Sequence, residues 1–405
     1  MFLRLALHSL LSRKGSVALT FLAISVSIFV VLGIEHIRQQ AKSSFSRTVS
    51  GADLIVGART GDINLLLYSV FRLGNATNNI SWASYQALAR HRDVAWTIPI
   101  ALGDSHRGYR VMGTTQDYFE HFRYGQSQAL SFTEGKGFAS TFEVVLGAEV
   151  ARSLDYPLDA NLVLAHGVAA TSFSEHNDKP FRVVGILDAT GTPVDQTLHI
   201  SLSGMEALHR DGLTANQNYQ LSPVSITAFM LGLKSKMATF RLQRAINNYQ
   251  REPLLAILPG VTLAQLWQMM AVMENTLRLV SALVLLASLL GLNAMLLTSI
   301  RERHREIAIM RTLGAPPLFL FLLIQAEALL ITLASSLLAL LLLLCCVFFL
   351  REYVSDHYSL TISANFFEPH MLQLLLIIIL GALASSLLPA IAVYSSALQQ
   401  RLHNG

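Results

Sequence analysis

Four segments of this chain are long and apolar enough to cross a membrane, and they constrain its fold more than any other feature. A membrane-spanning helix needs about 20 predominantly apolar residues. Segments 16–37, 276–300, 318–350 and 371–394 each reach that length. The composition agrees, because 52% of the 405 residues are hydrophobic and only 14% are charged. Soluble domains carry about 25% charged residues, so we expect a membrane protein.

The first apolar segment resembles a signal peptide only in its flank. The basic residues that precede it are Arg4, Arg13 and Lys14. The segment is longer than the roughly 7 to 15 apolar residues of a signal peptide, and GIEHIRQQ after it shows no small-residue cleavage pattern. We therefore expect a retained helix. Before it, a stripe near one side of residues 1–15 predicts an interfacial helix on the inner leaflet; the stripe consists of Phe2, Leu5, Leu7, Leu10 and Leu11.

Basic residues near the segment ends set the expected orientation. The amino-terminal segment and residues 301–311 are rich in Arg, whereas residues 351–370 carry more acidic than basic groups. Both termini and the 301–317 loop are therefore expected in the cytoplasm.

The expected fold class is an α-helical membrane protein with four transmembrane helices and a large mixed α/β extracytoplasmic domain inserted between helices 1 and 2. The segments are, in order, a cytoplasmic interfacial helix (1–15), transmembrane helix 1 (16–38), the extracytoplasmic domain (39–273), transmembrane helix 2 (274–300), a charged cytoplasmic loop (301–317), transmembrane helix 3 (318–350), a short extracytoplasmic loop (351–370), transmembrane helix 4 (371–394) and a cytoplasmic tail (395–405).

The inserted segment differs in character from the rest of the chain. Short apolar stretches such as ADLIVGA, EVVLGAEVA, FRVVGIL and TLHISL alternate with Gly- and Asn-rich turns, which is typical of β-strands. SWASYQALARH and KMATFRLQRAINNYQ have helical periodicity. This mixture predicts an α/β domain.

The sequence contains none of the common enzyme motifs GxxxxGK[ST], HExxH or GxSxG. GDSHRG, residues 103–108, places a serine beside an acid and a histidine. Catalytic triads are assembled from distant segments, so the interpretation of GDSHRG is a polar turn. We expect no catalytic residue, no cofactor in this chain and no nucleic-acid partner.

The segment SIRERHREIAIMRTLGA, followed by an apolar run containing QAEALL, resembles the permeases of MacB- and FtsX-type ABC transporters (type VII, mechanotransmitting). Other motifs of the family occur in its usual order. Two stretches resemble parts of its periplasmic core domain, VVLGAEVARSL and FRVVGILDATGTPVDQTLHISL, and a third, LLPAIAVYSSALQQRL, resembles its last helix. The tail departs from the family pattern, because Arg401 is alone where several basic residues are usual.

The resemblance implies a multi-pass permease of the bacterial inner membrane. Its ATPase, with ATP and Mg²⁺, would be a separate cytoplasmic ABC subunit dimer. A second permease copy, identical or related, would complete the complex. ATP-driven motion would pass to the periplasmic domain and act on a periplasmic protein, or on cargo such as a lipoprotein or peptide.

The charged loop is suited to binding this ATPase and to coupling its motion to the permease. A helix over residues 301–313 would carry an apolar stripe flanked by charges, which could dock in a groove of the ATPase. A basic anchor at the membrane end is the alternative. The expected ATPase-coupling residues are Arg301, Glu302, Arg303, Arg305, Glu306, Ile307, Met310, Arg311 and Gly314.

Two further groups of polar residues are candidates for function. Glu327 is an acid within the third apolar segment, where ionisable residues are functional by default; a structural role is the alternative. Glu274, Asn275 and Arg278, at the start of the second segment, are candidates for a stalk or dimer contact.

A weaker resemblance links the inserted domain to an uncharacterised subgroup associated with metal, especially zinc, acquisition. The donors that zinc accepts there are His166, Glu175, His176 and Asp178. A solvated turn is the alternative interpretation of these residues. Two alternative functions therefore stay open: an ABC transporter subunit for zinc, and a membrane-anchored sensor or scaffold without an ATPase.

Overall fold

The computed structural model describes residues 2–11, 13–48, 51–166, 179–210, 218–302, 309, 314–358 and 369–403. These residues fall into two compact units. The helical unit consists of Met1–Gln40, Ala271–Glu352 and Ile362–Gly405, and the α/β unit of Ala41–Met270 with Tyr353–Thr361.

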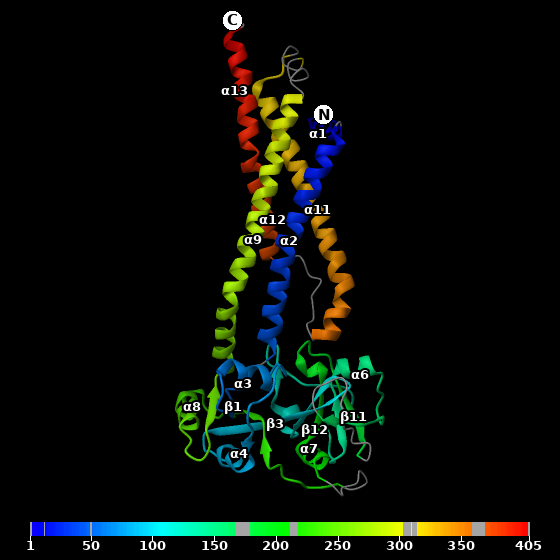
Figure 1. The fold of residues 1–405 in the computed structure, drawn as a ribbon, viewed down its shortest axis with the longest axis vertical. Coiled ribbons are helices and arrows are strands. Elements are labelled where there is room, and N and C mark those ends of the chain that lie inside the picture. Colours follow the sequence, from blue (N-terminus) through cyan, green and yellow to red (C-terminus); the bar gives the residue numbers. More distant parts are fainter. Residues whose placement is uncertain are drawn as a thin grey trace. The chain divides into compact units, whose positions relative to one another are not determined.

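Long helices build the helical unit (Figure 1). They are α1 (Phe2–Leu11), α2 (Lys14–Arg47), α9 (Pro259–Glu302), α11 (Pro317–Tyr358), α12 (Pro369–Ser385) and α13 (Leu387–His403). Four stretches are long and apolar enough to cross a membrane: Lys14–Ser43, Pro259–Glu302, Pro317–Leu350 and Pro369–Ser395.

The helices α2 and α9 are longer than a membrane crossing requires. They contain 34 and 44 residues, against the about 20 needed to span the hydrocarbon. Hydropathy marks only the apolar part of such a helix, and polar residues such as Lys42 and Gln268 continue it without a break. As a result α2 continues to Arg47, and α9 begins at Pro259.

Apolar residues one turn apart form the core of the helical unit. On α2, Ile24, Ile28 and Leu32 are fully buried, as expected for a stripe with spacing of four. They belong to one cluster with apolar residues of α9, α11, α12 and α13. The other faces of these helices expose Leu, Ile and Val, which is the surface that lipid requires.

The amino-terminal helix α1 packs on this core along one side. Ala6 is buried and Leu10 contacts the core cluster, whereas Leu7 and Leu11 are 47% and 58% exposed. The predicted apolar stripe is thus divided between two faces, because residues 6, 9 and 10 share a face that residues 7 and 11 do not.

The fourth apolar stretch is interrupted at Ser386, between α12 and α13. Pro389 lies four residues after Ser385 and has no N–H to donate to the Ser385 carbonyl, which kinks or ends a helix. Backbone bonds continue on both sides, from Ser386 N to Ala382 O at 2.9 Å and from Ala390 N to Ser386 O at 3.2 Å.

A mixed sheet of eleven strands forms the centre of the α/β unit as described, in the order β15-β1-β14-β3-β4-β12-β8-β11-β7, with β10 beside β3 and β9 beside β11. The strands are β1 (Leu54–Ala58), β3 (Val94–His106), β4 (Tyr109–Thr114), β7 (Phe132–Gly135), β8 (Glu143–Leu146), β9 (Asn161–Leu162), β10 (Ala165–His166), β11 (Phe181–Leu187), β12 (Thr197–Ser201), β14 (Ala228–Leu233) and β15 (Leu254–Ile257). Only the pairs β4–β12 and β8–β11 are parallel.

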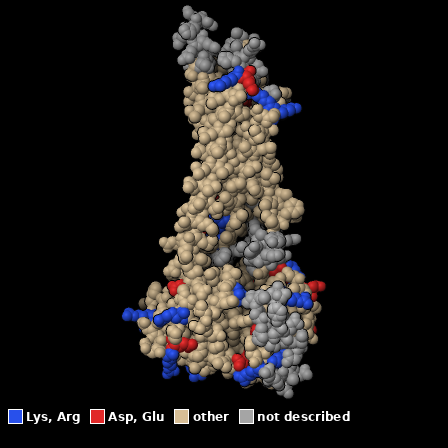
Figure 2. All heavy atoms as spheres, viewed as in Figure 1, with Lys and Arg blue, Asp and Glu red and all other residues tan. Residues whose placement is uncertain are grey.

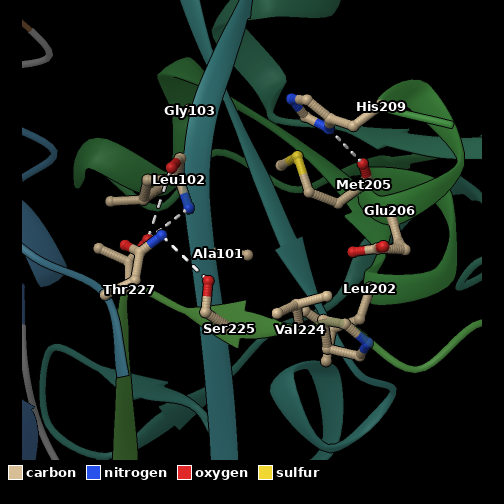
Figure 3. A pocket seen from close by; sticks show the side chains of 12 residues that line it. Ala101, Leu102, Gly103, Leu202, Met205, Glu206, His209, Val224, Ser225 and Thr227 are labelled. Carbon is tan, nitrogen blue, oxygen red and sulfur yellow. Dashed lines mark hydrogen bonds between the residues drawn. The ribbon is translucent and has the colours of Figure 1, made fainter. Parts of the chain in front are cut away.

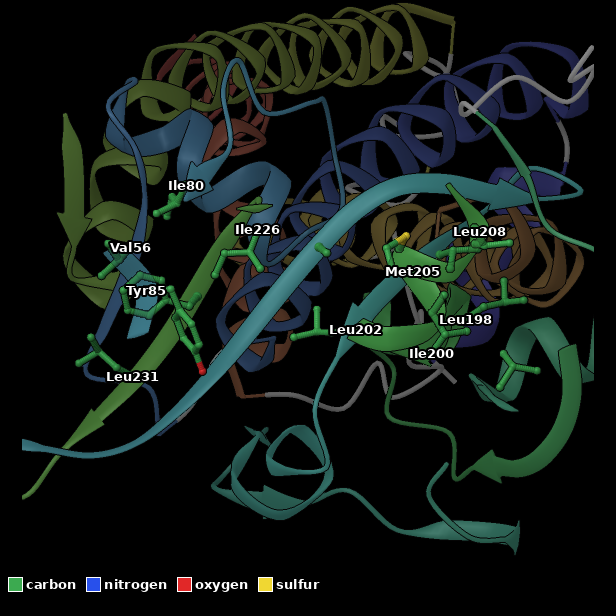
Figure 4. Close-up of a cluster of buried hydrophobic side chains, with 14 of the residues drawn as sticks. Val56, Ile80, Tyr85, Leu198, Ile200, Leu202, Met205, Leu208, Ile226 and Leu231 are labelled. Atoms are coloured by element: carbon green, nitrogen blue, oxygen red, sulfur yellow. The ribbon is translucent and has the colours of Figure 1, made fainter. Parts of the chain in front are cut away.

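Helices cover both faces of this sheet. Alternation along β14 sends Phe229 and Leu231 into one core cluster and Met230 into the other, as the two-residue period of a strand requires. The first cluster (Figure 4) includes side chains of α4 (Trp82–Ala89), α6 (Ala148–Leu154), α7 (Leu202–Leu208) and α8 (Thr239–Asn247). The second includes side chains of α3 (Asp62–Ser69) and α5 (Asp117–His121). The predicted fold class, four apolar helices with a mixed α/β domain between the first two, is confirmed.

Candidate functional site

Arg13 joins the beginning of the chain to the end of α9. It lies between α1 and α2, where its N–H donates to Leu10 O at 3.2 Å. Its Nη2 donates to the carbonyl oxygen of Ser299 at 2.9 Å, and its Nε lies 3.4 Å from Glu302 Oε2. These contacts place the guanidinium group of Arg13 beside the last described turn of α9.

Glu327 is joined to the same short helix. The carboxyl group of Glu327 is buried on α11, and Ser9 Oγ of α1 donates a hydrogen bond to its Oε1. A carboxyl group inside an apolar bundle is costly unless it has such partners. The structure therefore places Glu327 in a helix-to-helix contact with α1.

A second set of charges links α2 to α9 farther along both helices. Arg38 Nε donates to Glu35 Oε2 at 3.1 Å, and Arg38 Nη1 lies 3.5 Å from Glu274 Oε2. Arg278 Nη2 lies 3.5 Å from Glu35 Oε2. Positive and negative groups thus alternate across the two helices. We call Glu35, Arg38, Glu274 and Arg278 the four-charge cluster.

Polar side chains deeper in the bundle also bond from one helix to another. Asn293 Nδ2 of α9 donates to Ser385 Oγ, and Ser386 Oγ donates to Gln325 Oε1 at 3.0 Å. Ser335 Oγ of α11 donates to Phe21 O of α2 at 3.1 Å. These groups therefore act as contacts between helices, a usual role for Ser, Asn and Gln in membrane bundles.

The predicted coupling loop is described in part. Arg301 and Glu302 form the end of α9 and are exposed. Gly314 has a φ of +96°, the left-handed conformation that favours glycine after a helix. The remaining predicted coupling residues lie outside the described part of the chain: Arg303, Arg305, Glu306, Ile307, Met310 and Arg311.

The predicted zinc donors cannot be assembled from the described residues. His166 lies on β10, in register with Asp104 of β3, and Glu175, His176 and Asp178 lie outside the described ranges. A different group has metal-ligand chemistry: donor atoms of Asp117, Glu120 and His121 on α5 lie within 4.8 Å of one another.

The GDSHRG stretch is only partly a turn. Residues 103–106 complete strand β3, and only Arg107 and Gly108 turn into β4, both with positive φ. Asp104 and His106 are buried, so the interpretation as a polar turn was wrong for them. The ring nitrogens of His106 bond to Val163 O at 2.6 Å and Tyr156 Oη at 3.1 Å. His106 is therefore not paired with the neighbouring serine.

A hollow of about 250 Å³ lies in the α/β unit between β3 and α7 (Figure 3). Its wall includes the apolar side chains of Leu102, Leu202 and Met205. At one edge, His209 Nδ1 bonds to Met205 O at 2.8 Å, and His209 Nε2 lies 3.8 Å from the buried Asp104 Oδ2. Polar side chains, among them Glu206, Ser225 and Thr227, line the rest of the hollow.

Three buried polar side chains, Arg72, Tyr118 and His199, meet on the opposite face of the sheet. The rings of Tyr118 and His199 stack with centroids 5.1 Å apart. Burial, reinforced by Arg72, lowers the pKa of His199 to about 3. Burial raises the pKa of Tyr118 to about 12. Both rings are therefore neutral at ordinary pH.

Two family models match the chain. The MacB-like periplasmic core domain matches residues 17–249, and the FtsX-like permease C-terminal domain matches residues 278–400. The chain belongs to the MacB/FtsX family of ABC transporter permeases. This MacB/FtsX permease is a multi-pass membrane protein, and membership of the family implies a partner ATPase.

Among solved structures, the periplasmic region of MacB from Actinobacillus actinomycetemcomitans is 13% identical, with a TM-score of 0.36, covering 53% of this chain and 94% of that one. The extracellular domain of the noncanonic ABC-type transporter YknZ from Gram-positive bacteria is 9% identical, with a TM-score of 0.32, covering 50% of this chain and 98% of that one. No curated protein matches the chain.

Sequence reasoning identified Glu327, Glu274 and Arg278, but it missed their partners. The partners are Ser9 for Glu327, Arg38 for Glu274 and Glu35 for Arg278. The signal that could have found the four-charge cluster is the spacing of Glu35–Arg38 and Glu274–Arg278, three and four residues apart on otherwise apolar helices.

Proposed function

We propose that this permease transmits ATP-driven motion of a separate cytoplasmic ATPase dimer to its α/β unit. That unit then acts on a periplasmic partner, or on cargo such as a lipoprotein or peptide. In this proposal the chain is a non-catalytic subunit of the bacterial inner membrane, with both termini in the cytoplasm and a second permease copy beside it.

The observation that carries this proposal is the placement of the charges on α2 and α9. Arg13 and Glu302 pair near one end of the apolar stretches, and the four-charge cluster joins α2 to α9 near the other. Both helices are continuous between these points. Because α2 and α9 are continuous helices linked near both ends, they are suited to transmitting a displacement from one end to the other.

The polar groups inside the bundle support transmission over solute passage. A hydrophilic path requires polar side chains that face a common channel. Asn293, Gln325 and Ser335 instead bond to a neighbouring helix. Their side chains hold the bundle together.

The test is reconstitution of the permease with its ATPase in nanodiscs. Replacement of Glu306 by Lys together with Arg311 by Glu reverses charges in the coupling loop, so we expect loss of ATPase binding and of the permease-dependent part of ATP turnover. The matched control reverses a charge in the α/β unit, Arg152→Glu. Unchanged assembly and turnover in the loop variant would contradict the proposal, and a permease that binds no ABC ATPase would favour a sensor or scaffold.

Metal transport is a second candidate, which the cluster on α5 favours. Asp117, Glu120 and His121 offer two carboxylates and an imidazole, a donor set suited to first-row divalent metals. The His121 ring stacks on Trp96 with centroids 5.2 Å apart and planes 5° apart. Trp96 can therefore report on metal binding at His121.

Titration of Zn²⁺ into the detergent-solubilised full chain tests this candidate. Zinc transport predicts saturable quenching of tryptophan fluorescence that is lost in His121→Ala and kept in His91→Ala, which removes a half-buried histidine elsewhere in the α/β unit. A flat titration at micromolar Zn²⁺ would rule out this zinc site.

A further inference from the structure

We propose that α1 is a strap in the coupling apparatus, which carries displacement of the coupling loop directly into α2. This inference rests on the proposed function, because it assumes that an ATPase moves the loop. It assigns positioning roles to Arg13 and Ser9, which the family comparison does not single out.

The first observation is the two-point attachment of Arg13. Its guanidinium group reaches both the Ser299 carbonyl and the Glu302 carboxylate, at 2.9 Å and 3.4 Å. Its side chain is 13% exposed, while that of Glu302 is 59% exposed. An arginine that served only to orient the first span needs no fixed partner. Arg13 is held against the last turn of α9, where the coupling loop begins.

The second observation is the attachment of α1 to the helix on the other side of the loop. Ser9, 5% exposed, donates its hydroxyl proton to Glu327 Oε1, and Glu327 is 3% exposed. Glu327 belongs to α11, the helix that begins at Pro317, just after the loop. Both helices that flank the coupling loop are thus bonded to one short stretch of chain, residues 9–13.

The third observation is that this stretch has little freedom of its own. Ala6 is buried and Leu10 packs against the bundle core. Backbone bonds from Arg13 N to Leu10 O at 3.2 Å and from Val17 N to Arg13 O at 3.1 Å carry the chain from α1 into α2. A displacement of the α9 end therefore pulls on the first turn of α2.

The consequence is a second route for motion. Transmission along α9 alone would reach the α/β unit at Met270, where α9 enters that unit. The strap adds α2, which leads into the α/β unit from its other terminus at Ala41. The two long helices α2 and α9 would then move the α/β unit in one step.

The experiment uses the permease–ATPase complex in nanodiscs, with Cys345 and Cys346 first replaced by Ser. Spin labels at the exposed positions Ile37 on α2 and Leu372 on α12 report the position of α2 in the helical unit. Their separation is measured with and without vanadate-trapped ATP. We expect a nucleotide-dependent change in the otherwise unaltered complex.

Arg13→Gln combined with Ser9→Ala is expected to abolish this change while ATPase binding and hydrolysis persist. Lys14→Gln is the matched control. It also removes one positive charge, but Lys14 is the next residue in the chain and its side chain is exposed. This variant is expected to keep the nucleotide-dependent distance change. If the double variant does not fold, Arg13→Lys with Ser9→Thr takes its place, since these residues keep the charge and hydroxyl but lose the two-point geometry.

A wild-type distance change in a strap variant that still hydrolyses ATP would overturn the strap and leave the proposed function intact. A labelled permease that binds no ATPase would overturn both.

Discussion

At the scale of single residues, the buried ionisable side chains of Glu327 and His199 carry specific predictions. Glu327 stands out because an acid within an apolar segment is costly. Its partner Ser9 lies 318 residues away and has no distinguishing neighbours, since serine is common on apolar helices. His199 sits within the apolar strand TLHIS, and nothing in that stretch shows that both faces of the strand are covered.

Replacement of Glu327 tests its structural role. Glu327→Leu leaves the Ser9 hydroxyl without its acceptor, so we expect the free energy of unfolding to fall by about 1–3 kcal/mol, the cost of an unsatisfied buried polar group. Glu327→Gln keeps an acceptor oxygen and should lose less. Thermal unfolding in detergent measures both, and equal losses would contradict the bond to Ser9.

His199 predicts a loss of stability in acid. Its pKa is lowered to about 3 in the folded protein, against about 6.5 in an unfolded chain. The unfolded state therefore takes up a proton first as the pH falls. The stability contributed by neutral His199 is complete above about pH 6.5 and declines towards pH 3, by about 1.4 kcal/mol per pH unit for a fully buried group.

His199→Phe should remove this contribution, so the variant should lose less stability than the natural protein between pH 7 and pH 5. His91→Gln, which removes a half-buried histidine elsewhere in the α/β unit, is the control and leaves His199 in place. Unfolding of the α/β unit in the full chain, followed by tryptophan fluorescence, measures the slopes. Parallel slopes for His199→Phe and the natural protein would show that His199 is not held neutral.

At the scale of elements, hydropathy predicted the existence of the long helices better than their ends. Polar turns of α2 and α9 beyond the apolar stretches are invisible to a hydropathy window. The interruption between α12 and α13 at Ser386 follows from Pro389, so it can be predicted from the sequence. Strands β9 and β10, with two residues each, depend on tertiary pairing and have no local signature.

The four-charge cluster predicts measurable coupling between α2 and α9. In a double-mutant cycle with Arg38→Ala and Glu274→Ala, we expect an interaction energy of about 0.5–1 kcal/mol in favour of the native pair, because both groups are partly exposed and solvent screens them. As a control, the stability losses of Arg38→Ala and Glu206→Ala should be additive, because Glu206 forms a separate ion pair with Arg210. Additive losses would contradict the contact between Arg38 and Glu274.

At the scale of the whole molecule, the order of motifs predicted the family, and two family models confirm it. The motifs are local in sequence, so they can be recognised without any knowledge of the contacts. The contacts of Arg13 with Glu302 and of Ser9 with Glu327 could not be predicted in the same way. They join residues hundreds of positions apart and become visible only when the helices are packed.

The proposed function requires that ATP-driven motion reaches the α/β unit. Hydrogen–deuterium exchange on the permease–ATPase complex in nanodiscs, with and without vanadate-trapped ATP, tests it most directly. We predict that trapping changes the protection of β1 and β15, the strands nearest in sequence to α2 and α9. Identical exchange throughout residues 41–270, while the same complex hydrolyses ATP, would contradict the account.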